Sequence, residues 1–492
     1  NTTAEGNTAV GNSAMQNNTT GTENVAVGSG ALTTNVTGVN GTAVGNDALK
    51  LNTGDSNSAF GRRALCTNSS GSANVALGVN ALLSNTTAND NVAVGNAALT
   101  TNTTGCENTA VGRCALKANT TGIRNVAVGK GALKTNITGS SNVAIGREAL
   151  GVATNNNNTS VGFDSMQATT TGADNTAVGM KALFTNTIGI GNTAIGTYAL
   201  QANTTACENT AVGYVALSTN TTGNLNSAFG RGALQVTTTG SSNVAVGTNA
   251  LSENTTGECN TAIGVCALRV ETTGANNTAA GFKSLSANTT GEANVAIGAC
   301  SMLANTTATG GVALGADSLK ANTTGGTNTA IGRQALLTNS TGSCNAAFGA
   351  FALLRTTTGV CNTAVGPSDT MKENTTGTQN VAVGMLALTN NTTGSNNVAV
   401  GYCALRLVNS AGSQNVGMGT NALFTVSTGT RNTAIGDSSG LNITTGTCNI
   451  SIGQNTQHSG STVNREIVIG IDEEGKGSDT GFLDGSSGVF NK

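Results

Sequence analysis

Apolar and polar residues follow one another along this chain in an order that repeats about every 17 residues. An apolar segment that ends in glycine, Asn-Thr-Ala-Val-Gly at 108–112, is followed by Ala-Leu at 115–116 and by an Asn-Thr-Thr-Gly turn at 119–122. With the glycine that closes the apolar segment as a marker, 28 markers run from Gly11 to Gly470, and 23 of their 27 spacings are 17 residues. The chain is therefore one repeat array rather than a series of unrelated domains.

This repeat predicts an all-β fold. Asn, Thr and Gly occupy about half of its positions, so no apolar stripe with helical spacing can form. Asn-Thr-Ala-Val and Ala-Leu-x-x are two short β-prone segments, separated by turns that contain glycine. One unit cannot bury its few apolar side chains alone, but stacked units share a core. We therefore expect a parallel β-solenoid or β-roll with one 17-residue coil per repeat, about 28 coils in all. At ~4.8 Å between strands, such a stack is on the order of 130 Å long.

The repeats also predict the domain boundaries. We expect the regular solenoid array to span residues 1–452, and degenerate last coils with a C-terminal cap or transition segment to span 453–492. Apolar runs of only a few residues exclude a transmembrane helix. Because the chain begins at Asn1 without methionine, we expect a processed product or a fragment.

The strand segment predicts which residues lie inside each coil. We expect the Val or Ile directly before the marker, and the Leu four residues after it, to fill the interior. The near-constant alanine two residues before the marker would then face the opposite side, because side chains alternate along a strand. A small residue kept there indicates either a surface that a neighbouring subunit approaches closely or a thin core that alanine fills. The markers themselves should adopt a turn conformation that a Cβ would hinder. The candidate subunit-contact residues are Ala76, Ala93, Ala110, Ala127 and Ala144.

Two columns of asparagine accompany the apolar segments. In the first, four residues before each marker, we expect the side chains to stack amide to amide: Asn74, Asn91, Asn108, Asn125 and Asn142. The second column lies in the turns and satisfies the Asn-x-Ser/Thr acceptor pattern, so it either carries glycans or serves turn geometry and stacking. Candidate glycosylation sites are Asn85, Asn102, Asn119, Asn136, Asn203, Asn220, Asn288, Asn305 and Asn322.

Residues for catalysis or metal binding are scarce. The single histidine, His458, has no Cys or carboxylate at ligand spacing in the sequence, and we expect it in an exposed loop. The stretch 470–477 matches Gly-x-x-x-x-Gly-Lys, but Gly477 replaces the Ser or Thr that binds magnesium, and three acids in the loop would repel phosphate. We therefore expect no enzyme, no metal and no cofactor.

The eleven cysteines contain no Cys-x-x-Cys pair, which argues against zinc. Cys344 and Cys361 are one repeat apart, and stacked coils would bring them within reach of a disulfide. The alternative is that cysteine replaces Ala, Ser or Thr at tolerant positions.

Charge and composition narrow the partners. Only 9% of the residues are charged and 3% are aromatic, the chain has no Trp, and its formal net charge is −2. This balance gives no electrostatic reason to expect nucleic acid or insertion into a membrane. Paired threonines in the turns suggest an ice-binding surface, but they lie in turns rather than on a flat strand, and basic residues intrude on the surface. These basic residues are Arg113, Lys117, Lys130, Lys134 and Arg147.

The repeat Asn-Thr-Ala-Val-Gly-x-x-Ala-Leu-x-x-Asn-Thr-Thr-Gly resembles the arrays of tail-fibre-like proteins of phages and of large DNA viruses of algae. Its core, Asn-Val-Ala-Ile-Gly at 142–146, is similar to the repeat in the β-roll heads of trimeric autotransporter adhesins. The resemblance covers the chain from Asn7 to about Gly470, and the stretches 466–470 and 475–482 resemble the segment that succeeds such arrays in viral fibres. It implies a trimeric fibre.

These observations predict a structural fibre shaft or adhesin, extracellular on a virion or cell surface, that associates with itself as a homotrimer. Host-surface glycans are expected partners, bound weakly at many repeated sites. The alternatives are a self-assembling extracellular filament or matrix protein and, less favoured, an ice-binding solenoid.

Overall fold

The computed structural model describes residues 3–409 and 412–483, and the chain divides into two compact units, Asn1–Asn243 and Val244–Lys492. Both units consist of three-residue β-strands joined by turns and bends, and the described residues contain no helix. Unit 1 holds β1 (Thr8–Val10), β2 (Val25–Val27), β3 (Thr42–Val44), β4 (Ser58–Phe60), β5 (Val75–Leu77), β6 (Val92–Val94), β7 (Thr109–Val111), β8 (Val126–Val128), β9 (Val143–Ile145), β10 (Thr159–Val161), β11 (Thr176–Val178), β12 (Thr193–Ile195), β13 (Thr210–Val212) and β14 (Ser227–Phe229). Unit 2 holds β15 (Val244–Val246), β16 (Thr261–Ile263), β17 (Thr278–Ala280), β18 (Val295–Ile297), β19 (Val312–Leu314), β20 (Thr329–Ile331), β21 (Ala346–Phe348), β22 (Thr363–Val365), β23 (Val381–Val383), β24 (Val398–Val400), β25 (Val416–Met418), β26 (Thr433–Ile435), β27 (Ile450–Ile452), β28 (Ile467–Ile469) and β29 (Gly481–Leu483).

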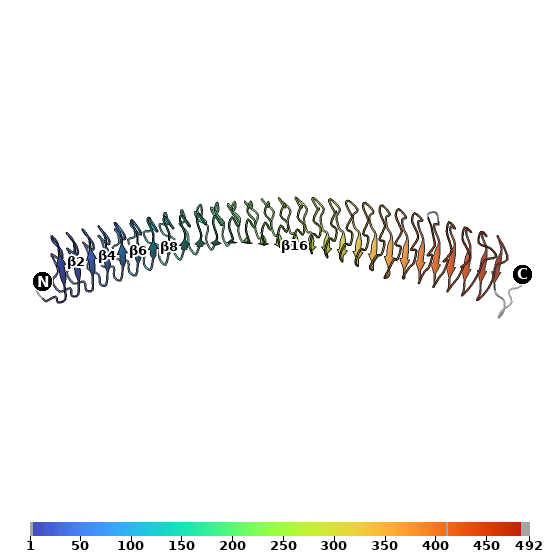
Figure 1. Ribbon diagram of the computed structural model, residues 1–492, viewed down its shortest axis with the longest axis horizontal. Coiled ribbons are helices and arrows are strands. Elements are labelled where there is room, and N and C mark those ends of the chain that lie inside the picture. Colours follow the sequence, from blue (N-terminus) through green and yellow to red (C-terminus); the bar gives the residue numbers. More distant parts are fainter. Residues whose placement is uncertain (1–2, 410–411, 484–492) are drawn as a thin grey trace. The chain divides into compact units, whose positions relative to one another are not determined.

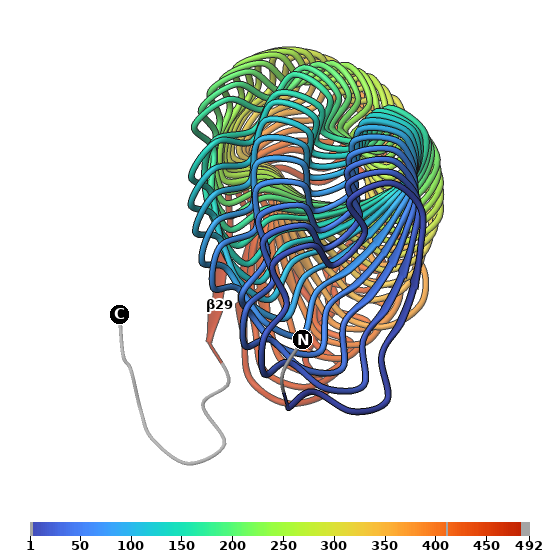
Figure 2. The ribbon, with the colours of Figure 1, turned by 90° about the vertical axis from the view of Figure 1, so that its left-hand side faces the viewer.

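Within each unit the coils stack as a parallel β-solenoid (Figure 1). Each strand pairs in parallel with the equivalent strand of the next coil, so that Ala110 of β7 lies opposite Ala127 of β8. Every one of the 28 marker glycines directly follows a strand, which confirms the predicted fold class and the one-coil repeat. Viewed along the stack, the coils are narrow loops (Figure 2).

The second predicted strand segment, Ala-Leu-x-x, is wrong: it forms turns. Its leucine has a left-handed backbone, with φ of 48° at Leu116 and 49° at Leu133, which no β-strand can contain. The conformation is retained because the next coil satisfies the backbone: the Leu116 N–H donates to the Ala132 carbonyl at 2.9 Å. This turn brings the leucine side chain back into the coil, where it is fully buried.

The marker glycines have the conformation that the sequence predicts. At Gly95, φ is 135°, and a Cβ would lie 2.6 Å from the carbonyl oxygen of Gly112 on the next coil. Any side chain would therefore collide with the backbone of the neighbouring coil. Glycine is required here by both the dihedral angle and the contact.

The assignment of the two strand faces is reversed relative to the prediction. The middle residue of the strand is buried, and the Val or Ile before the marker points outward and is exposed or half-buried. Gly417, which replaces the usual alanine, shows why: even a Cβ there would lie 3.1 Å from Leu405 Cγ of the preceding coil. The interior is narrow at this position, which alanine occupies in 24 of the 28 coils, although the larger Val468 is also buried there in the coil of β28. The alternative of a thin alanine core is therefore confirmed, and the proposed subunit contact through the alanine side chains is wrong, because all five are fully buried: Ala76, Ala93, Ala110, Ala127 and Ala144.

The coils beyond residue 452 continue the same ladder. Ser451 of β27 lies opposite Val468 of β28, and β28 in turn pairs with β29. The part of the predicted C-terminal segment at 484–492 lies outside the described residues.

Candidate functional site

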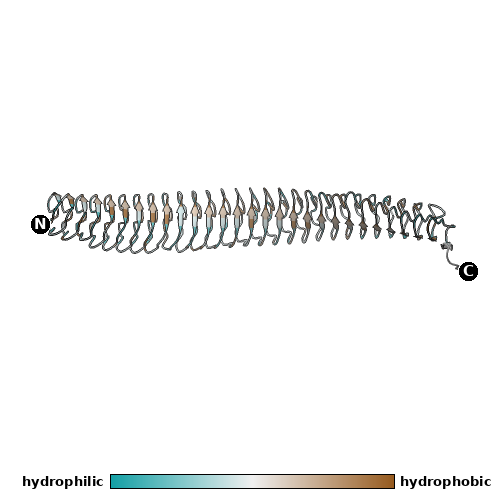
Figure 3. Cartoon of the chain, turned by 90° about the horizontal axis from the view of Figure 1, so that it is seen from below, coloured by the Kyte–Doolittle hydropathy of each residue, from teal (hydrophilic) through white to brown (hydrophobic). Residues whose placement is uncertain are grey.

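The outer face of the strands carries the most regular exposed feature of the molecule. The residue directly before the marker is apolar in all 28 coils, and we call this column of side chains the strand stripe. In Figure 3 the strands of both units are coloured toward the hydrophobic end of the scale. Members with more than a third of their surface exposed are Val10, Val27, Phe60, Leu77, Val111, Ile145, Val178, Ile195 and Phe229 in unit 1, and Val246, Ile263, Ile297, Phe348, Val365, Val383, Met418, Ile435 and Ile452 in unit 2.

The first asparagine column forms the predicted ladder inside the coils. The Oδ1 atom of Asn91 accepts hydrogen bonds from the backbone N–H of Asn108 at 3.0 Å and from its Nδ2 at 3.2 Å. The Asn108 Nδ2 also donates to the carbonyl of Gly122 at 2.9 Å. Each amide thus satisfies polar groups on two coils, which is why it can be buried without cost to the fold. Asn74, Asn91, Asn108, Asn125 and Asn142 are all fully buried.

The second asparagine column forms a second ladder. The Asn102 Nδ2 donates to Asn85 Oδ1 at 3.0 Å and to the Gly105 carbonyl at 2.9 Å, and Asn119 repeats the pattern on Asn102 at 2.8 Å. An N-linked glycan would have to be attached to this same nitrogen. The glycosylation prediction is therefore wrong for the folded chain, and the alternative of turn geometry and stacking is confirmed. The fully buried residues concerned are Asn85, Asn102, Asn119, Asn136, Asn203, Asn220, Asn288, Asn305 and Asn322.

A glutamate occupies one position of the second ladder in unit 2. Glu271 is fully buried, and its Oε2 accepts hydrogen bonds from the Nδ2 atoms of Asn288 and Asn277. Burial raises the pKa of Glu271 to about 7, against the lowering effect of the hydrogen bond from Asn288. The sequence analysis did not identify this residue, although its phase in the repeat, one unit before Asn288, was the available signal.

The last coils end the first ladder with a carboxylate instead of an amide. Glu466 is buried, and its N–H donates to Asn449 Oδ1 at 2.9 Å as an asparagine would. Burial acts to raise the pKa of Glu466, but the N–H groups of Gly477 (2.6 Å) and Ser459 (3.0 Å) outweigh it and hold the pKa below its usual value. The His458 ring contributes, with Nδ1 at 2.9 Å from Glu466 Oε2, while burial lowers the pKa of His458.

The contacts of Glu466 bear on two predictions about this end of the chain. The exposed loop histidine is wrong, since His458 is fully buried. The glycine-rich stretch 470–477 directs the Gly477 N–H to an internal carboxylate, and that contact uses the donor that a phosphate would need. In the structure this stretch thus serves the Glu466 carboxylate that ends the first asparagine ladder.

The cysteines are all free, and all eleven lie within the described residues. Cys344 and Cys361 are both exposed on successive coils as free thiols, and the disulfide between them stays a prediction. Cys344 Sγ lies 3.2 Å from Thr327 Oγ1. The alternative, cysteine in place of small residues, agrees with this placement.

The two threonines of each turn have different surroundings. The hydroxyl of Thr86 donates to the Thr103 carbonyl of the next coil at 3.0 Å, whereas Thr87 is exposed. Half of each pair thus contributes to stacking of the coils.

Neither a metal site nor a spanning helix is found in the part of the chain that the structure describes. Across residues 3–409 and 412–483, no three His, Cys, Asp or Glu side chains gather as metal ligands would. No helix among them has the length and apolar character needed to cross a membrane. Compared with protein-family models and with curated proteins, the sequence matches none of them, and the resemblance to viral fibres and adhesin heads stays a prediction.

Proposed function

We propose that the chain is the shaft of a structural fibre on a virion or cell surface, formed by three identical chains. The shaft holds a binding end away from the particle and offers its own repeated surface for attachment at many weak sites. No enzymatic activity is part of this proposal. The observation that carries it is the strand stripe.

Exposure of the strand stripe disfavours a solitary chain. In unit 1 alone, nine large apolar side chains on one face give an apolar patch on the order of several hundred Å². Patches of this size on soluble proteins mark interaction sites. The strands alternate in the sense opposite to a usual half-buried sheet, with alanine inside and the larger residue outside. The larger residue is therefore available to a partner rather than to the core.

The spacing of the strand stripe favours another copy of the chain as its partner. Its side chains follow one another at one per coil, about 4.8 Å apart. A surface that matches them over many coils must have the same period, which a second identical chain has by construction. Identical β-faces can interdigitate as dry, tightly packed layers. Three stripes that meet on a common axis would leave the turns and charged positions of every coil in solvent.

Electron microscopy of the whole chain tests this proposal. We expect discrete rods of one length, on the order of 130 Å for 28 coils at ~4.8 Å. Filaments of unlimited length would favour the alternative of a self-assembling matrix protein. Rods that are one chain wide would contradict both assignments.

A further inference from the structure

One region of unit 1 concentrates positive charge. We call Arg113, Lys117, Lys130, Lys134 and Arg147 the basic cluster; they hold five of the 22 Lys and Arg residues of the chain, and all five are exposed. They form two columns on successive coils, because Arg113, Lys130 and Arg147 directly follow markers and Lys117 and Lys134 lie four residues further on.

Backbone hydrogen bonds fix these columns. The Gly131 N–H donates to the Arg113 carbonyl at 3.0 Å, and the Glu148 N–H donates to the Lys130 carbonyl at 3.0 Å. Neighbouring cations in one column are therefore attached to backbones about one coil spacing apart, ~4.8 Å.

The basic cluster lacks the acids that neutralise similar lysines elsewhere. Lys50 pairs with Asp47 at 3.1 Å, and Lys320 pairs with Asp317 at 2.9 Å, in each case with an acid three residues earlier. At the equivalent positions, Lys117 follows Cys114 and Lys134 follows Gly131. Within the described residues, none of the five cations forms an ion pair. Unneutralised like charges so close together repel one another, and a bound polyanion would relieve that repulsion.

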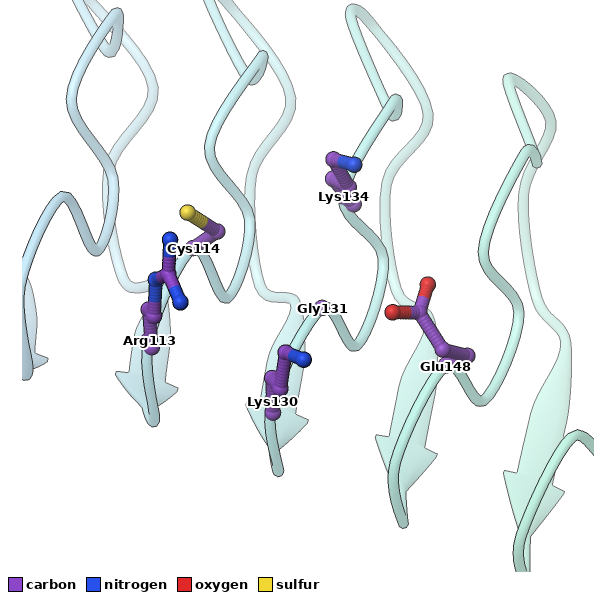
Figure 4. A pocket seen from close by; sticks show the side chains of 6 residues that line it. All are labelled: Arg113, Cys114, Lys130, Gly131, Lys134 and Glu148. Carbon is purple, nitrogen blue, oxygen red and sulfur yellow. The ribbon is translucent and has the colours of Figure 1, made fainter.

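The surface is hollowed at the same place. A depression of about 260 Å³ is lined by Arg113, Lys130, Lys134 and Glu148, on three successive coils (Figure 4). Lys134 also lines a second depression, of about 470 Å³, together with the apolar side chain of Ile137. Cationic groups thus stand beside an apolar wall, an arrangement that suits a sugar with both charged groups and apolar ring faces.

We infer that the basic cluster is a binding site for a linear anionic polysaccharide, aligned with the stacking direction of the coils. Sulfate or carboxylate groups on successive sugars would lie against the two cationic columns, and Glu148, the one acid in the depression, would accept from a sugar hydroxyl. Single-stranded nucleic acid is disfavoured because it binds to aromatic stacking platforms, whereas no aromatic ring lines these depressions and the Phe163 ring beside the cluster already faces the Arg147 guanidinium, 5.2 Å from the ring centroid. The inference rests on the proposed role in attachment and names the chemistry of the attached surface.

Binding of the whole chain to four immobilised probes tests the inference: dextran sulfate, alginate, neutral dextran and a thymidine oligonucleotide. We expect binding to the anionic polysaccharides alone, weakened by added salt. Dextran sulfate and alginate separate sulfate from carboxylate recognition. Binding to neutral dextran, or tighter binding to the oligonucleotide than to either anionic polysaccharide, would overturn the inference.

Two variants with equal charge loss locate the site. Replacement of Arg113, Lys117, Lys130 and Lys134 by Gln should weaken binding at least about tenfold, since each loses a charge-assisted contact. Its control variant removes four scattered cations and should change binding less than about twofold: Lys181→Gln, Arg231→Gln, Lys283→Gln and Arg333→Gln. Equal losses of polysaccharide binding in both variants, or no loss in the first, would show that the basic cluster is not the binding site. Sedimentation of the same samples reports self-association separately, so that failure of the fibre proposal is distinguishable from failure of this one.

Discussion

The inside and the outside of a single coil differ in a way that hydropathy does not anticipate. In the coil of β7, the polar Asn108 and the small Ala110 are fully buried, whereas Val111 is 36% exposed. The asparagine can be buried because the same residue on the adjacent coil supplies its hydrogen-bond partner. The valine is outside because it alternates with the inward-facing residue of the strand, which is the small alanine in 24 of the 28 coils. Burial in this solenoid is thus decided by width and by the partner on the next coil.

The largest expected effect comes from removal of one ladder amide. Asn108→Ala would leave the buried Asn125 N–H without its acceptor. It would also remove one of the two hydrogen bonds at Asn91 Oδ1 and one of the two at the Gly122 carbonyl, which keep the backbone N–H of residue 108 and Asn119 Nδ2 as donors. At about 1–3 kcal/mol for the unsatisfied N–H and about 0.5–1.5 kcal/mol for each of the two other lost hydrogen bonds, we expect a loss of about 2–6 kcal/mol in unfolding free energy. Urea denaturation measures it, with the exposed Thr121→Ala as a control expected within about 0.5 kcal/mol. Similar midpoints for both variants would contradict a structural role for the ladder.

A smaller effect is expected where the ladder holds a carboxylate. The pKa of Glu271 is about 7 in the folded chain against 4.5 for the free side chain, so the folded state binds more protons between these values. Stability should therefore fall as pH rises from about 4.5 to about 7, by about 3 kcal/mol, and then stay level. Glu271→Gln should abolish this dependence and stabilise the chain at pH 8. Thermal unfolding from pH 4 to pH 8 measures both effects. If the stability of the variant depends on pH as strongly as that of the parent, Glu271 is not the group responsible.

Changing the size of the side chains on the two strand faces should lower the unfolding free energy by a smaller amount. Ala110→Val places two extra carbons against the narrow interior, and overpacking of this kind costs about 1–3 kcal/mol. The matched change on the outside, Val111→Ala, should cost under about 0.5 kcal/mol in a dissociated chain, because the site is exposed. Denaturation curves of both variants measure these changes. A larger loss of unfolding free energy for Val111→Ala than for Ala110→Val would indicate that the valine, not the alanine, lies inside.

The smallest effect on stability is expected at a left-handed corner of the coil. Arg63 has φ of 57°, a conformation that costs a non-glycine residue about 1 kcal/mol. Arg63→Gly should raise the unfolding free energy by some tenths of a kcal/mol, since glycine adopts this angle freely but loses more entropy on folding. Arg62→Gly, next to it, lacks the positive φ and should destabilise. Calorimetry measures both variants, and equal changes in their unfolding free energies would contradict backbone strain at Arg63.

The sequence was sufficient to predict features that depend on the period. Coil length, parallel pairing and amide stacking all follow from identical residues that recur at fixed spacing, as at Asn91 and Asn108. Alternation along a strand shows that Ala110 and Val111 face opposite sides, but it does not say which side is inside. That depends on the width of the coil, and the left-handed turn at Leu116, which brings the leucine side chain into the interior, is not evident from the sequence. The burial of His458 likewise depends on a tertiary contact with Glu466, eight residues away and placed beside it only by the last coils.

Sedimentation equilibrium of the whole chain tests most directly whether the strand stripe joins identical chains. The parent is expected at three chain masses. A variant with Leu77, Val111, Ile145 and Ile195 replaced by Thr should fold but dissociate toward one chain mass at protein concentrations where the parent stays at three, because threonine keeps the β-propensity and removes part of the apolar surface. A control with equally exposed residues off the strands, Val36→Thr, Ile137→Thr, Ile188→Thr and Val236→Thr, should keep three. A parent at one chain mass, or a stripe variant that stays at three, would contradict the account.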